Sequence, residues 1–128
     1  MLEHEMSLVL QTGPFTPPDL LIQELAATPG IQVDARRVGA AFRGGGVGSF
    51  IRVTATNNHG AGLAAILHRH TERLWEKGGD NLFILLGGRI NTDEPVVDFR
   101  DVQFRRQISL KDKSEAEIKD VLSKNSGG

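Results

Sequence analysis

The chain has 128 residues, no cysteine and a formal net charge of -1. This length predicts a single domain over residues 1–128, large enough to bury a core without cross-links, and the absence of cysteine excludes disulfides and thiolate chemistry. The near-zero net charge and the 5% aromatic content, with no tyrosine, argue against recognition of nucleic acid through charge or base stacking.

The charges are distributed unevenly along the chain. Residues 1–35 contain five acids and no Lys or Arg, whereas residues 36–106 contain all ten arginines. Because arginine offers a planar fork that suits carboxylates and phosphates, a local anion-binding or acidic-partner surface is an alternative to a merely solvated one. No apolar run is long enough to span a bilayer, and the N-terminus has no signal-peptide pattern, so we expect a cytoplasmic protein without membrane contact.

Short apolar stretches between turn residues predict four strands, at residues 7–12, 31–38, 49–56 and 82–86. The run Leu82–Leu86 is apolar without alternation, as in a strand that is covered on both faces. We therefore expect this strand at the centre of the sheet and the shorter, alternating strands at its edges.

Two helices are predicted between these strands. The first begins at Pro18, whose missing N–H costs nothing at a helix start, and ends at Pro29-Gly30. The second begins at Asn57 or Asn58 and runs to about Lys77, before two glycines. Helical spacing places five residues of this second helix on one face: Leu63, Ile66, Leu67, His70 and Leu74.

The C-terminal part predicts smaller elements. Residues 96–104 are strand-like, with a bulge or bend near Asp101 because the apolar residues change phase there. Ile108 and Leu110 indicate one more short strand, and the capping box Ser114–Glu117 begins a last amphipathic helix. Residues 1–6 and 124–128 are expected to be frayed tails, and we assign no ubiquitin-like role to the final diglycine.

The order strand–helix–strand–strand–helix–strand is typical of a split βαβ arrangement. The predicted fold class is therefore α+β, a ferredoxin-like open sheet with its helices on one face. A C-terminal hairpin and helix would extend this sheet.

The glycine-rich segment 44–48 suggests a phosphate-binding loop, but the required Lys and following helix are missing. A flexible hairpin connection is the simpler interpretation. The alternative is a small-anion or nucleotide site at this loop and at the helix start His59–Gly62. Its candidate ligand-binding residues are Arg43, Gly45, Gly46, Gly48 and His59.

His68 and Glu72 lie four residues apart and share a helix face, which suits metal ligation, but two ligands are too few. His68 and His70 point to different sides of the helix and cannot bind one ion together. A metal-dependent hydrolase is therefore the last-ranked hypothesis. We assign no catalytic residue, metal or cofactor, and whether the protein is an enzyme stays open, with the residues favouring a non-catalytic role.

The outer face of the second helix is charged, which is most simply a solvated surface. Arg69, Arg73 and Trp75 nevertheless form a candidate partner-binding set, because exposed tryptophan often anchors protein contacts. The first-ranked hypothesis is therefore a non-catalytic protein–protein interaction or adaptor module. An outer sheet edge would also allow two copies of the chain to pair.

Apolar and glycine positions over most of the chain resemble the effector-associated constant component family, small accessory domains of bacterial conflict systems. The resemblance rests on five features: Leu20–Leu25 before Pro29-Gly30-Ile31, Gly44–Gly48, Gly60–Leu63 with a charged helix ending in Trp75, Gly87-Gly88-Arg89 with Val96–Phe99, and Ile118–Leu122. The long segment 99–113 and the first helix, which lacks tryptophan, depart from the family pattern. The resemblance implies a non-enzymatic adaptor and transfers no catalytic residues.

Overall fold

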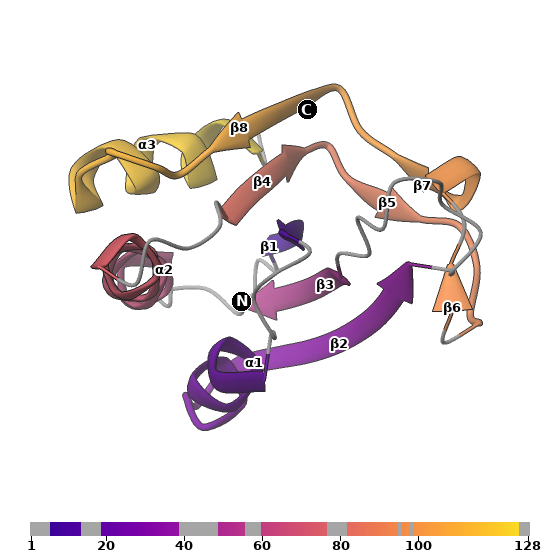
Figure 1. The fold of residues 1–128 in the computed structure, drawn as a ribbon, viewed down its shortest axis with the longest axis horizontal. Coiled ribbons are helices and arrows are strands. Elements are labelled where there is room, and N and C mark those ends of the chain that lie inside the picture. Colours follow the sequence, from indigo (N-terminus) through magenta and orange to yellow (C-terminus); the bar gives the residue numbers. More distant parts are fainter. Residues whose placement is uncertain are drawn as a thin grey trace, which may run out of the picture.

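The computed structural model describes residues 6–13, 19–38, 49–55, 60–76, 82–94, 96–97 and 99–125. The described residues form three α-helices packed on one side of a twisted sheet, so the predicted α+β class is confirmed (Figure 1). No helix in this part of the chain is long and apolar enough to cross a membrane.

Five antiparallel strands form the body of the sheet, in the spatial order β2-β3-β1-β4-β8. Their bounds are β1 Met6–Thr12, β2 Ile31–Val38, β3 Ser49–Ala55, β4 Leu82–Leu86 and β8 Arg106–Ser109. The short strand β6 (Val96–Val97) adds to β2 in parallel. Two further pieces, β5 (Arg89–Ile90) and β7 (Val102–Gln103), pair with each other in a separate ribbon.

The prediction that Leu82–Leu86 is the central strand needs a correction. β4 lies between β1 and β8, so it is inside the sheet, but β1 and β3 occupy the middle. Both faces of β4 are nevertheless covered: Leu82 and Ile84 join the main core, and Leu85 joins a second apolar cluster on the opposite face. The continuous apolar run thus reflects two-sided burial and does not fix the position of the strand in the sheet.

All three helices cover the same face of the sheet, as Figure 1 shows. They are α1 (Asp19–Ala26), α2 (Gly60–Glu76) and α3 (Glu115–Asn125). The predicted stripe of α2 is buried, including Leu63, Leu67 and Leu74, against Leu8 and Leu10 of β1 and their neighbours in one cluster. Burial of this stripe removes its apolar surface from water and therefore holds the helix layer in place.

A smaller apolar cluster lies on the opposite face of the sheet. It consists of Val9, Phe50, Leu85, Ile90, Val97 and Val102. The chain reaches this face by a sharp turn directly after β4, where Gly87 has a φ of 67° and a Cβ on Gly88 would lie 2.9 Å from Cβ of Val9. Glycine fits both positions because it tolerates positive φ and close backbone approach.

The strand-like segment over residues 96–104 is divided into two short strands. Val96–Val97 pairs with β2, and Val102–Gln103 pairs with β5, with the 3₁₀ turn η1 (Phe99–Asp101) between them. The change of apolar phase near Asp101 corresponds to this turn, so of the two predicted alternatives the bend is confirmed and the bulge is not. The two halves of the segment 96–104 therefore belong to different sheets.

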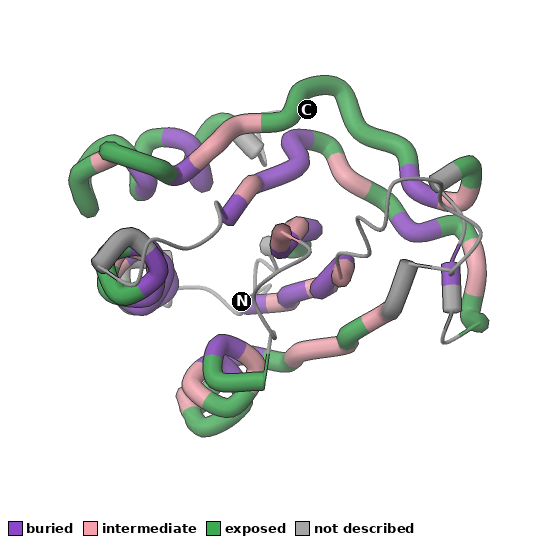
Figure 2. The backbone as a smooth tube through the Cα atoms, viewed as in Figure 1, coloured by how far each residue is buried: buried purple, intermediate pink, exposed green. Residues whose placement is uncertain are grey.

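The C-terminal helix begins as the capping box predicts. The Ser114 hydroxyl accepts a hydrogen bond from the Glu117 amide, and Glu117 Oε1 accepts one from the Ser114 amide, both at 3.1 Å. α3 continues to Asn125, so the predicted tail begins later than expected. Figure 2 shows one side of α3 buried and the other exposed, while the described side chains of β8 remain half-buried or exposed at the rim of the sheet.

Candidate functional site

The predicted small-anion site lies largely outside the described residues. This holds for Arg43, Gly45, Gly46, Gly48 and His59. Gly62, at the predicted helix start, is described and exposed, with open space where a Cβ would stand. The small-anion hypothesis therefore stays a prediction.

The predicted partner-binding arginines contact the first helix. Arg73 Nη1 lies 2.6 Å from Glu24 Oε1, and Arg69 Nη2 lies 3.9 Å from Glu24 Oε2. Glu24 thus joins α1 to α2 in a cluster that we call the α1–α2 seam, defined by Glu24, Arg69, His70 and Arg73. Both arginines keep about half of their side-chain surface exposed, so a role in partner binding stays a prediction. Trp75 lies in α2, and its side chain is outside the described part.

His70 is the buried histidine that the apolar stripe predicts. Only 4% of its surface is exposed, and its Nδ1 makes no hydrogen bond in the described part of the chain. Burial lowers the pKa of His70; the Glu24 carboxylate opposes this shift and the Arg73 guanidinium adds to it. The imidazole is therefore held neutral, inside the seam, at neutral pH.

The predicted metal-competent pair is present on the outer face of α2. His68 Nε2 lies 3.1 Å from Glu72 Oε1, one helical turn away. Among the described residues, no group of three His, Asp or Glu side chains is arranged to hold a metal ion. The pair is an ordinary i,i+4 contact of an exposed helix face.

A second charged network lies on the sheet face away from the helices. Arg36 pairs with Asp34 at 2.8 Å and donates to the Glu94 carbonyl at 2.7 Å, while Arg52 Nη2 donates to the Ile90 carbonyl at 3.1 Å. These bonds attach the segment after β4 to the sheet. Because these donors are used on the chain's own backbone, the network is structural.

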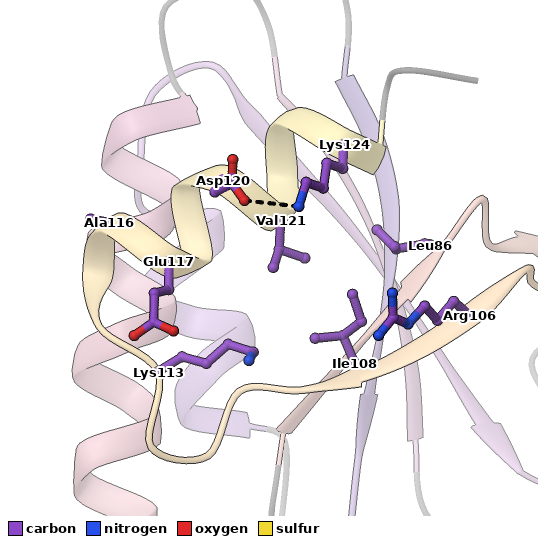
Figure 3. A pocket seen from close by; sticks show the side chains of 9 residues that line it. All are labelled: Leu86, Arg106, Ile108, Lys113, Ala116, Glu117, Asp120, Val121 and Lys124. Carbon is purple, nitrogen blue, oxygen red and sulfur yellow. Dashed lines mark ion pairs between the residues drawn. The ribbon is translucent and has the colours of Figure 1, made fainter.

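The described surface is hollowed between β8 and α3, where a groove of about 480 Å³ opens to solvent. We call it the β8–α3 groove, and it is lined by Leu86, Arg106, Ile108, Lys113, Ala116, Glu117, Asp120, Val121 and Lys124. Figure 3 shows Val121 pointing down from α3 and Ile108 pointing up from β8, with Leu86 beside them. The centre of the groove is therefore apolar.

Charged side chains stand around this apolar centre. Lys124 Nζ lies 3.1 Å from Asp120 Oδ2, so these two charges are paired within the chain. Glu117 is held by the cap at Ser114, whose backbone N–H and hydroxyl, in that order, lower the pKa of the carboxyl. Arg106 and Lys113 form no ion pair within the described residues, but the charge of Lys113 acts on Glu117. Arg106 is therefore the cation that the groove offers a partner.

The strand below the groove is the last one in the sheet. β8 pairs with β4 on one side, and no described strand pairs with its other side. The Leu110 amide donates to the Leu82 carbonyl at 2.8 Å, which sets the alternation of the ladder. Ile108 accordingly bonds toward β4, whereas the backbone N–H and C=O groups of Gln107 and Ser109 point away from β4, along the groove side of the edge.

The sequence reasoning found the elements of this groove but did not join them. The alternation at Ile108 and Leu110 and the capping box at Ser114 are both visible in the sequence. Their short connection requires the last helix to fold back beside the last strand, which is the signal that could have indicated a groove. Which strand β8 would join was not evident, because that pairing depends on β4, more than twenty residues earlier.

Comparisons with known proteins give no match: no family model, no curated protein and no solved structure is similar to this chain.

Proposed function

We propose that the protein is a non-catalytic protein-binding module and that the β8–α3 groove is its docking surface. The main observation behind the proposal is a groove between a strand edge and a helix, with partly buried Ile108 and the edges of Leu86 and Val121, each 8% exposed, at its centre. Beside this centre Arg106 forms no ion pair with any described residue. Open apolar surface rimmed by polar groups is characteristic of interaction sites. The resemblance to the effector-associated constant component family, which implies an adaptor, agrees with this function.

We also propose that the core is a split βαβ, ferredoxin-like unit. The strand order β2-β3-β1-β4, with α1 and α2 as its two connections, supports this assignment. On this view β8 and α3 are additions at the β4 edge. The docking groove would then be formed by the extension and not by the core unit itself.

Selection from a random peptide display library tests the proposed function. The protein is immobilised, peptides are enriched, and the binding of enriched peptides is measured by fluorescence anisotropy. We expect enriched peptides whose affinity falls at least tenfold when Ala116 is replaced by Trp, because the indole would fill the groove from α3.

Lys119→Trp is the matched control, since Lys119 is exposed on the same helix and does not line the groove. Its affinity should equal that of the unaltered chain. Thermal unfolding of both variants checks that they fold. Failure to enrich any peptide, or equal binding by the Ala116→Trp variant, would refute the docking surface. If Ala116→Trp does not fold, amide chemical shifts of the unaltered protein with peptide locate the site instead.

A further inference from the structure

We infer that the groove takes an extended peptide, which adds to the free edge of β8 as an antiparallel strand. The peptide would carry an aliphatic side chain opposite Ile108 and an acidic side chain opposite Arg106. This inference rests on the proposed docking surface and specifies the chemistry of its partner. Three features support this inference: the backbone of β8, the side chains of β8 that face the groove, and the charges around the groove.

The backbone of β8 determines the pairing. Gln107 and Ser109 point their N–H and C=O groups away from β4, so a strand laid along this edge can exchange hydrogen bonds with both residues. Peptides commonly bind exposed sheet edges in this way, with backbone bonds giving affinity and alternate side chains giving specificity. Antiparallel pairing is the slightly more stable of the two possible directions.

The alternation of β8 determines which peptide side chains enter the groove. Arg106 and Ile108 lie two residues apart and both face the groove, as Figure 3 shows. The peptide residues opposite them form non-hydrogen-bonded pairs, in which side chains approach most closely. In antiparallel pairing the residue opposite Ile108 comes two positions before the residue opposite Arg106. The peptide pattern is therefore aliphatic–any–acidic, read from N- to C-terminus.

Charge complementarity selects the acidic residue. The acids of the groove each have an internal partner: Asp120 pairs with Lys124 at 3.1 Å, and Glu117 accepts a hydrogen bond from the Ser114 amide at 3.1 Å and interacts with the charge of Lys113. Arg106 is exposed, and its guanidinium forms no ion pair with any described residue. A carboxylate opposite it would gain a bidentate partner, whereas a basic residue would meet Arg106 and Lys113 as like charges.

The first experiment exchanges the charges. Ten-residue peptides with an aliphatic–any–acidic centre, and the same peptides with lysine in the acidic position, are titrated by fluorescence anisotropy. The acidic peptides should bind the unaltered protein about tenfold more tightly than the lysine peptides. Arg106→Glu should reverse this preference, and Lys119→Glu, which makes the same charge change on α3 outside the groove, should leave it unchanged.

The second experiment tests the strand pairing. N-methylation of the residue between the aliphatic and acidic positions removes the N–H that would bond to the Gln107 carbonyl, and we expect about a tenfold loss of affinity. N-methylation of the aliphatic residue leaves affinity unchanged, because its N–H points away from β8. Equal losses for both peptides would overturn strand addition.

The outcomes separate the inference from the function that it deepens. If peptides bind and are blocked by Ala116→Trp, but show neither charge reversal nor the N-methyl pattern, the docking surface stands and the strand model is wrong. If library peptides fail to bind at all, both are wrong. If the protein dimerises in light scattering and Ala116→Trp abolishes the dimer, the occupant is a second copy of the chain and the peptide inference is overturned.

Discussion

The α1–α2 seam and the β8–α3 groove differ in how their charged side chains are paired. In the α1–α2 seam, Arg73 Nη1 of α2 lies 2.6 Å from Glu24 Oε1 of α1, so a carboxylate of one helix pairs with a cation of the other. In the β8–α3 groove, Arg106 and Lys113 flank an apolar floor without an ion pair among the described residues. The seam therefore serves the fold, and the groove is the surface that we propose for a partner.

The seam also differs from the groove in packing. Leu21 and Leu25 of α1 and Leu67 of α2 are fully buried, so the seam is closed over the main core. Across the groove, Leu86 and Val121 each keep 8% of their surface exposed, Ile108 is only partly buried and Ala116 is exposed. A partner that covers Ile108 and Ala116 would remove this remaining apolar surface from water.

The largest expected effect comes from the core beneath the seam. Leu67→Ala should lower the free energy of unfolding by about 3 kcal/mol, because it leaves a cavity in a packed interior. Urea denaturation followed by circular dichroism measures this loss. Ala116→Gly, at an exposed position, should cost about 1 kcal/mol at most. A loss below 1 kcal/mol for Leu67→Ala would show that the helix layer is not packed as described.

The next effect separates the groove from the seam. Ser114→Ala removes the hydroxyl that caps the Glu117 amide, and we expect about 1 kcal/mol of destabilisation. Peptide affinity should fall as well, because α3 forms one wall of the groove. Lys119→Ala, at an exposed position on the same helix, is the control. Unchanged stability in Ser114→Ala would contradict the role of the capping box.

A pH-dependent effect is expected from the seam. The pKa of His70 is lowered in the folded state, so the unfolded chain binds the proton more readily and the associated stability is lost as pH falls below about 6.5. Glu24 opposes this shift, while Arg73 reinforces it. His70→Leu should flatten the decline of the melting temperature between pH 7 and pH 5. An identical decline in His70→Leu would exclude His70 as the source.

The smallest effect is expected at the rim of the groove. Asp120→Asn breaks the exposed pair with Lys124 and should change the free energy of unfolding by less than about 0.5 kcal/mol. Affinity for the acidic peptides should rise modestly, since Lys124 is released and one negative charge is removed. Weaker binding of acidic peptides by this variant would contradict the assigned polarity of the groove.

The sequence predicted the helices and strands better than it predicted which strands pair with each other. The stripe of α2, the capping box at Ser114 and the buried run Leu82–Leu86 follow from local periodicity and capping, and all three are confirmed. The place of β4 in the sheet was mispredicted, and the division of residues 96–104 between two sheets was not predicted. Both depend on pairing between segments distant in the chain, which local patterns do not encode.

The groove was missed for the same reason. Its floor combines Leu86 of β4, Ile108 of β8 and Val121 of α3, and each of these residues follows an ordinary core pattern in its own element. Sequence reasoning instead selected segments with unusual composition, such as the glycines at 44–48 and the arginines of α2. Composition indicated positive charge in the middle of the chain, but it could not indicate which cations form no ion pair within the described residues.

Amide hydrogen exchange, measured by NMR with and without a saturating aliphatic–any–acidic peptide, shows whether the peptide pairs with the edge of β8. We expect exchange to slow at least tenfold at Gln107 and Ser109, whose amides point away from β4, and to change little at Ile108, which already bonds to β4. Protection confined to α2, or absent from Gln107 and Ser109 while the peptide is bound, would contradict this pairing.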